Sequence, residues 1–162
     1  MIIKIKELIN HFLVRENLDD FKKKDNLILI SCFFYILPAL YILYSPLKRY
    51  HFLAFISFLQ IILSVLSDYT LIEIKSKDKF CKTIGILDRL NSIIYTIYIL
   101  YFVFMSSKIP SLLYVSLAIF LIEYSRDSKN QIQWVCRHSL WHLASSLILL
   151  LCLRQMNNIS NL

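Results

Sequence analysis

Two histidines, His138 and His142, are four residues apart in an apolar stretch near the end of the sequence. Side chains at i and i+4 lie on the same face of a helix, so one helix would present both imidazoles to a single zinc ion. With a carboxylate from a neighbouring helix as third ligand, the metal keeps a position for water and lowers the pKa of that water toward about 7. Such an arrangement would suffice for hydrolysis, with zinc as the cofactor. The alternative is that the two histidines form hydrogen bonds to Asp or Ser and hold helices together.

Two earlier apolar stretches each carry a row of polar residues at helical spacing, so that each row shares one helical face. The rows are Ser57, Gln60, Ser64, Ser67 and Asp68 on the first of these stretches, and Asp88, Asn91, Ser92 and Tyr95 on the second. Ionisable groups are costly at membrane depth and mark candidate functional sites there. Asp68 and Asp88 are thus the carboxylates that could join the two histidines.

The elements that must position these residues are membrane-spanning helices. Of the 162 residues, 57% are hydrophobic and 18% are charged, against roughly 45–50% and about 25% in an ordinary soluble domain. The apolar residues form blocks that are too long for strands and lack the alternation of a membrane β-barrel. The sequence predicts an all-α, multi-pass transmembrane helix bundle. With one glycine in the chain, a glycine-rich phosphate-binding loop is excluded.

Five apolar blocks are expected to span the membrane. They comprise residues 27–44, 52–72, 83–106, 109–124 and 132–153, of which the fourth is short for a perpendicular span. Residues 1–26 are expected to form an amphipathic helix on the membrane surface, ending in three lysines, with Asp25-Asn26 as N-cap of the first span. Residues 154–162 form a polar tail.

The distribution of basic residues predicts the orientation of the bundle. With five spans, twelve Lys and Arg residues fall on the side of the N-terminus and four on the other side. The positive-inside rule then places the N-terminus in the cytosol and the C-terminus in the lumen or outside the cell.

This topology brings the polar rows together. Asp68 is at the end of the second block, while Asp88 and His138 are near the start of the third and fifth blocks, so all three lie toward the cytosolic side. At about 1.5 Å per residue, Asp88 and His138 lie roughly 8 and 9 Å inside their blocks. We therefore expect the carboxylates and imidazoles to share a pocket near the cytosolic face.

The segment 137–146, Arg-His-Ser-Leu-Trp-His-Leu-Ala-Ser-Ser, resembles the last-helix signature of a superfamily of membrane hydrolases. The superfamily includes alkaline ceramidases, progestin and adiponectin receptors and myomaker-related proteins, and the Trp before the second His resembles the myomaker-related branch most. The resemblance implies zinc-dependent cleavage of a lipid amide or ester bond. It also implies an Asp and a Ser near the metal-bound water, roles that fall to Asp88 and to Ser64 or Ser67.

The sequence departs from the superfamily in two respects. The family has seven spans, whereas this chain has about five, and the family's third histidine ligand, on the second span, has no counterpart here. Either Asp68 replaces that histidine, so that His138, His142 and Asp68 bind the metal, or the site has lost its metal and the chain is a non-catalytic relative.

Two other classes of function compete with the hydrolase. In the first, the chain is a non-enzymatic membrane subunit or scaffold, whose buried polar residues hold helices together. The second is a small transporter or proton pathway, which the lack of Gly- or Pro-broken helices disfavours. The expected partners are membrane lipids, including a lipid substrate, and a second copy or another membrane protein. Nucleic acid is not expected, because the basic residues form short runs between apolar blocks.

Overall fold

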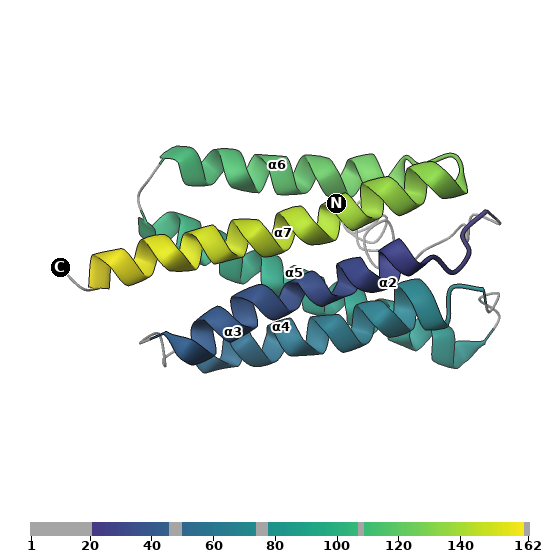
Figure 1. Cartoon of the computed structure of the whole chain (residues 1–162), viewed down its shortest axis with the longest axis horizontal. Helices are drawn as coiled ribbons and strands as arrows, with labels where there is room; N and C mark the ends of the chain where they lie inside the picture. The colour runs from purple at the N-terminus through teal and green to yellow at the C-terminus, as the bar shows by residue number, and fades with distance from the viewer. Residues whose placement is uncertain (1–20, 46–49, 74–77, 107–108, 161–162) are drawn as a thin grey trace, which may run out of the picture.

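The computed structural model describes residues 21–45, 50–73, 78–106 and 109–160. Within these ranges every regular element is helical and no strand occurs, so the prediction of an all-α bundle is confirmed (Figure 1). The predicted amphipathic helix falls largely on residues 1–20, which lie outside the described ranges.

The first helical stretch consists of α2 (Asn26–Cys32), the 3-10 turn η1 (Phe33–Tyr35) and α3 (Ile36–Tyr44). It starts at the predicted N-cap, where the carboxylate of Asp25 accepts a hydrogen bond of 2.8 Å from the backbone N–H of Leu27. Such a cap satisfies one of the N–H groups that have no partner within the helix.

Pro38 explains how the first stretch is attached to the last helix. A proline has no N–H, so the carbonyl of Phe34, four residues earlier, cannot form the usual α-helical hydrogen bond to residue 38. It does accept a hydrogen bond from a backbone N–H at the end of η1. That carbonyl also accepts a hydrogen bond from the hydroxyl of Ser146 on α7 (Gln131–Ser160). The missing hydrogen bond at Pro38 thus leaves room for a contact between the first helical stretch and α7.

The second stretch begins as α4 (His51–Ser64) and ends as a π turn, η3 (Val65–Thr70). In a π turn each N–H bonds to the carbonyl five residues earlier, and the N–H of Leu71 continues this pattern to the carbonyl of Leu66 at 2.9 Å. Single π turns inside α-helices occur frequently at functional sites. Here the turn carries Ser67 and Asp68.

The remaining helices are α5 (Lys79–Ser106), α6 (Ile109–Arg126) and α7. The last of these continues past residue 153, where the apolar block ends, because no Pro or Gly interrupts residues 154–160. Much of the expected polar tail is thus the final part of a long helix.

Helix α7 lies in the middle of the bundle and contacts α2, α3, α5 and α6. In Figure 1, α6 runs along one side of α7, and α2 and α3 run along the other. The main core includes Tyr35, Ile42, Leu53, Trp141 and Leu149, which come from α4 and α7 and from the first stretch. Burial of these apolar side chains holds the helices around α7.

Three of the helical stretches are long and apolar enough to cross a membrane: Asn26–Tyr44, His51–Thr70 and Gln131–Gln155. This is consistent with an integral membrane protein. For α5 and α6 the predicted spans stay predictions, as does the total of five. Both helices nevertheless expose large apolar side chains, among them Ile97 on α5 and Phe120 on α6, and extensive apolar surface of this kind is typical of contact with lipid.

One end of the bundle collects the end of η3 and the starts of α2, α5 and α7 (Figure 1). We call it the site end, because the candidate residues lie toward it. The basic residues described there, in the connections and in the adjoining ends of α5 and α6, are Lys22, Lys23, Lys24, Lys79, Lys82, Arg126 and Lys129. That this end faces the cytosol is the prediction of the positive-inside rule.

Candidate metal centre

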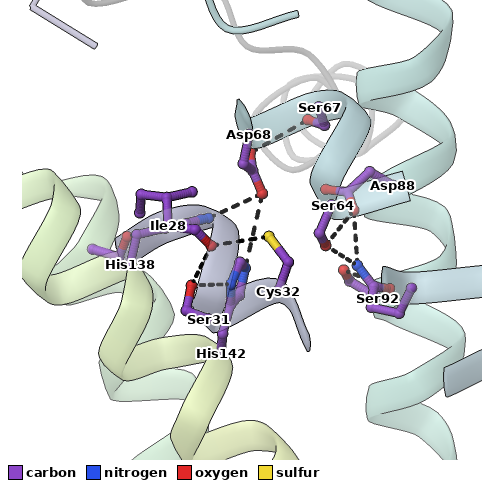
Figure 2. A network of polar contacts seen from close by, with 12 residues as sticks. Ile28, Ser31, Cys32, Ser64, Ser67, Asp68, Asp88, Ser92, His138 and His142 are labelled. Carbon is purple, nitrogen blue, oxygen red and sulfur yellow. Dashed lines mark hydrogen bonds and ion pairs between the residues drawn. The ribbon is translucent and has the colours of Figure 1, made fainter. Parts of the chain in front are cut away.

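His138, His142 and Asp68 meet at the site end, although the aspartate and the first histidine are separated by 70 residues of sequence. The Nε2 of His138 lies 3.1 Å from Oδ2 of Asp68, and the Nε2 of His142 lies 3.8 Å from the same oxygen. Figure 2 shows both imidazoles, which come from α7, directed at the carboxylate of Asp68. The structure thus brings together the three residues assigned as ligands in the sequence analysis.

The three side chains are shielded from the surroundings. Asp68 is 4% exposed and His142 is 2% exposed, while the side chain of His138 is 16% exposed. The indole of Trp134 stacks on the ring of His138 with centroids 5.5 Å apart, and the ring of Tyr35 packs against His142 at the same centroid distance. These aromatic rings limit the orientations open to both imidazoles.

The donor atoms suit a single metal ion. One ligand atom from each residue can be chosen so that all three lie within 4.8 Å of one another. Two atoms that are each 2.0–2.1 Å from a tetrahedral zinc ion lie about 3.3 Å apart. The two separations between Oδ2 of Asp68 and the Nε2 atoms of His138 and His142, 3.1 and 3.8 Å, bracket this value. Two imidazole nitrogens and a carboxylate oxygen are also a donor set that zinc prefers, so the group could hold a metal ion.

Two serines contact the other ring nitrogens. The Oγ of Ser31 on α2 lies 2.9 Å from Nδ1 of His142, and the Oγ of Ser125 on α6 lies 2.9 Å from Nδ1 of His138. Both serines are buried. The sequence analysis did not identify them, because a single serine in an apolar block gives no sign of which helix it will face.

Asp88 belongs to a second polar group, between α4 and α5. Its Oδ1 accepts hydrogen bonds from Nε2 of Gln60 at 2.8 Å and from Oγ of Ser64 at 2.9 Å. The side-chain oxygen of Gln60 in turn accepts hydrogen bonds from Asn91 at 2.8 Å and from Ser92 at 3.3 Å. The predicted catalytic pair of Asp88 and Ser64 is therefore in contact, but with Gln60 rather than in the group of three ligands.

The π turn accounts for the separation of the two polar groups. In a continuous α-helix Ser64 and Asp68, four residues apart, would lie on one face, as the sequence pattern suggests. A π turn uses more residues per turn, so Asp68 is turned relative to Ser64. Consequently Ser64 contacts Asp88 on α5, whereas Asp68 contacts His138 and His142 on α7 (Figure 2).

Ser67, the third predicted catalytic residue, lies beside Asp68 in the π turn. Its hydroxyl donates a hydrogen bond of 3.4 Å to Oδ1 of Asp68, the oxygen that does not face the histidines. In this structure Ser67 is thus placed to orient the carboxylate. Its catalytic assignment, like those of Ser64 and Asp88, stays a prediction.

Comparison of the chain with protein-family models, with curated proteins and with solved structures found no match.

Proposed function

We propose that this protein is an integral membrane metalloenzyme that binds zinc through His138, His142 and Asp68 and hydrolyses an amide or ester bond of a lipid. The observation that carries the proposal is the convergence of two Nε2 atoms on one buried carboxylate oxygen. The resemblance of residues 137–146 to the last-helix signature of membrane hydrolases supports the same chemistry.

A purely structural role explains only part of this arrangement. The 3.1 Å contact between His138 and Asp68 has the length of an ordinary hydrogen bond. The 3.8 Å contact between His142 and Asp68 is too long for one, yet the Nε2 of His142 is directed at the same oxygen. A cation shared by the three groups accounts for both distances, and it also offsets the cost of burying the carboxylate.

The ligand set suits catalysis better than a closed structural site. Structural zinc sites have four protein ligands, whereas catalytic sites have three and keep the fourth position for water or substrate. When bound, zinc activates that water and polarises a carbonyl group. Of the residues of this chain, Ser67 is placed to orient the Asp68 carboxylate, and Asp88 with Ser64 is the candidate pair for handling a proton.

The position of the centre favours a lipid substrate. His138 lies seven residues after Gln131, where α7 begins, which corresponds to about 10 Å along the helix axis. That depth is near the boundary between the headgroups and the hydrocarbon core. Amide and ester bonds of membrane lipids lie at this boundary, so such a bond could reach the centre without leaving the bilayer.

The first test is the metal content of the purified full chain in detergent. We expect about one zinc ion per chain, and we expect its loss in His142→Ala and in Asp68→Asn, because each substitution removes a ligand. Ser139→Ala is the matched control, since Ser139 lies on the same helix and its buried hydroxyl has no partner among the described residues. A folded wild-type chain without metal would overturn the proposal.

The second test is hydrolysis of fluorescent N-acyl and O-acyl lipids by the zinc-loaded chain in mixed micelles. Cleavage that stops on treatment with a chelator and returns with zinc supports the hydrolase. If the chain binds zinc but cleaves neither class of bond, the metal site stands and the hydrolase is wrong.

One observation favours a second candidate, a non-catalytic membrane subunit or scaffold. The group of Gln60, Ser64, Asp88 and Asn91 is closely hydrogen-bonded and joins α4 to α5. Buried polar contacts of this kind hold membrane helices together. On this alternative the same groups serve packing alone, and neither metal nor hydrolysis is found.

A further inference from the structure

We propose that Ser31 and Ser125 are positioning residues of the metal centre, each accepting a hydrogen bond from Nδ1–H of one histidine so that Nε2 of that histidine faces the metal. This inference rests on the proposed metal binding and adds the residues that fix the two imidazoles. Figure 2 shows the contact of Ser31 with His142 and the carboxylate beyond the ring.

The argument is most direct for Ser31. A serine hydroxyl has a single hydrogen, and that of Ser31 donates to the carbonyl of Ile28 at 2.7 Å. Toward Nδ1 of His142, 2.9 Å away, the same oxygen therefore acts as acceptor, and Nδ1 carries the proton. In the neutral imidazole the lone pair is then on Nε2, the atom that faces Asp68.

Ser125 holds His138 in the corresponding way. Its Oγ lies 2.9 Å from Nδ1, and the Nε2 on the far side of the ring lies 3.1 Å from Asp68. The ring is also stacked on Trp134, at an angle of 27°. A hydrogen bond at one nitrogen and a stacked indole on the ring face together leave the imidazole with one preferred orientation.

The two serines act from opposite sides of α7. Ser31 lies on α2 and Ser125 lies on α6, and these helices run along the two sides of α7 (Figure 1). Each ring is therefore held by a different neighbouring helix. Rotation of either ring would break the contact between its Nδ1 and the serine and would turn its Nε2 away from Asp68. Metal-binding histidines in proteins almost always donate their second ring N–H to such a partner, and removing the partner typically costs 10–100-fold in metal affinity.

The experiment measures zinc affinity of the full chain in detergent by competition with a chelator. We expect Ser31→Ala and Ser125→Ala each to weaken zinc binding about 10–100-fold, with zinc still bound at saturation. Two controls separate positioning from packing. Ser139→Ala removes a buried hydroxyl without a partner, and Ser146→Ala removes the contact with the Phe34 carbonyl. We expect both controls to bind zinc as the wild type does, even where Ser146→Ala lowers the melting temperature.

A second measurement needs no variant. In the zinc-loaded wild-type chain labelled with ¹⁵N-histidine, NMR should show Nδ1 protonated and Nε2 bound to the metal in both His138 and His142. Coordination through Nδ1 would overturn the inference.

The outcomes separate this inference from the proposed function. A wild-type chain that binds no zinc contradicts the proposed function itself. If the wild type binds zinc and both serine variants bind it with unchanged affinity, the centre exists and the positioning role is wrong. An equal loss of affinity in Ser146→Ala would likewise assign the effect to helix packing.

Discussion

Asp68 joins two histidines that come 70 and 74 residues later in the chain. Burial of this carboxylate among apolar helices costs free energy unless partners compensate for the lost hydration. The sequence alone was enough to predict the three residues of the candidate centre, because two histidines four residues apart and a carboxylate are unusual inside apolar blocks. Ser31 and Ser125 were not visible, since their role depends on which ring nitrogen each meets after α2 and α6 have packed against α7.

Gln60 provides a residue-scale prediction about the second polar group. The change Gln60→Met keeps the length of the side chain but removes its hydrogen bonds to Asp88, Ser64 and Asn91. We expect a loss of about 1–3 kcal/mol in stability, because buried polar groups lose a partner. We expect an unchanged zinc affinity, because the hydrogen bonds of Gln60 described above go to the second polar group and to none of the three ligands. The measurements are the melting temperature in detergent and the chelator competition described above.

A different result would change the assignment of this group. If Gln60→Met weakened zinc binding as strongly as Ser31→Ala, the second polar group would have to be counted as part of the centre. Loss of lipid hydrolysis with full zinc binding would instead support a role for Asp88 in the reaction.

At the scale of elements, the sequence predicts helices well because long apolar blocks in lipid have few alternatives to a helix. It does not predict the π turn η3. Residues 65–70 pack against α5 and reach α7 through the side chain of Asp68. A one-dimensional pattern contains neither contact and treats the stretch as uniform α-helix. The polar row of the second block was therefore expected on one face, whereas the turn divides it between two neighbouring helices.

Pro38 leads to a prediction at this scale. In the wild type, Ser146→Ala should cost about 0.5–1.5 kcal/mol, because the Phe34 carbonyl loses the hydrogen bond from this hydroxyl and keeps only the one from the backbone. In a Pro38→Ala background the new backbone N–H can bond to that carbonyl, so the same change at Ser146 should cost clearly less. A double-mutant cycle of melting temperatures measures the difference. Equal costs in the two backgrounds would show that the hydroxyl is not compensating for the proline.

At the scale of the whole molecule, the topology was predictable as far as charge and hydropathy determine it. They indicate which connections share an end, and this suffices to bring Asp68 near His138 and His142. They do not give the order of packing around α7, and that order determines which neighbours meet the two rings.

Cys81 tests the predicted orientation of the molecule. It lies half-buried near the start of α5, at the site end, where desolvation and the neighbouring Asp78 carboxylate raise the pKa of its thiol. Because the thiolate is the reactive form, we expect slow labelling by a membrane-impermeant maleimide at neutral pH, faster labelling as the pH rises, and faster labelling in Asp78→Asn. In sealed vesicles labelling should occur only from the cytosolic face. Cys81→Ser is the control, and labelling from the opposite face would reverse the assigned orientation.

The span of 70 residues between Asp68 and His138 also affects how the protein is made. The helix that carries the carboxylate is synthesised before the one that carries the imidazoles. A nascent chain therefore reaches the bilayer with an acidic group whose histidine partners do not yet exist. Both histidine contacts of Asp68 form only after the final helix has been added, so a product truncated before residue 138 would lack them.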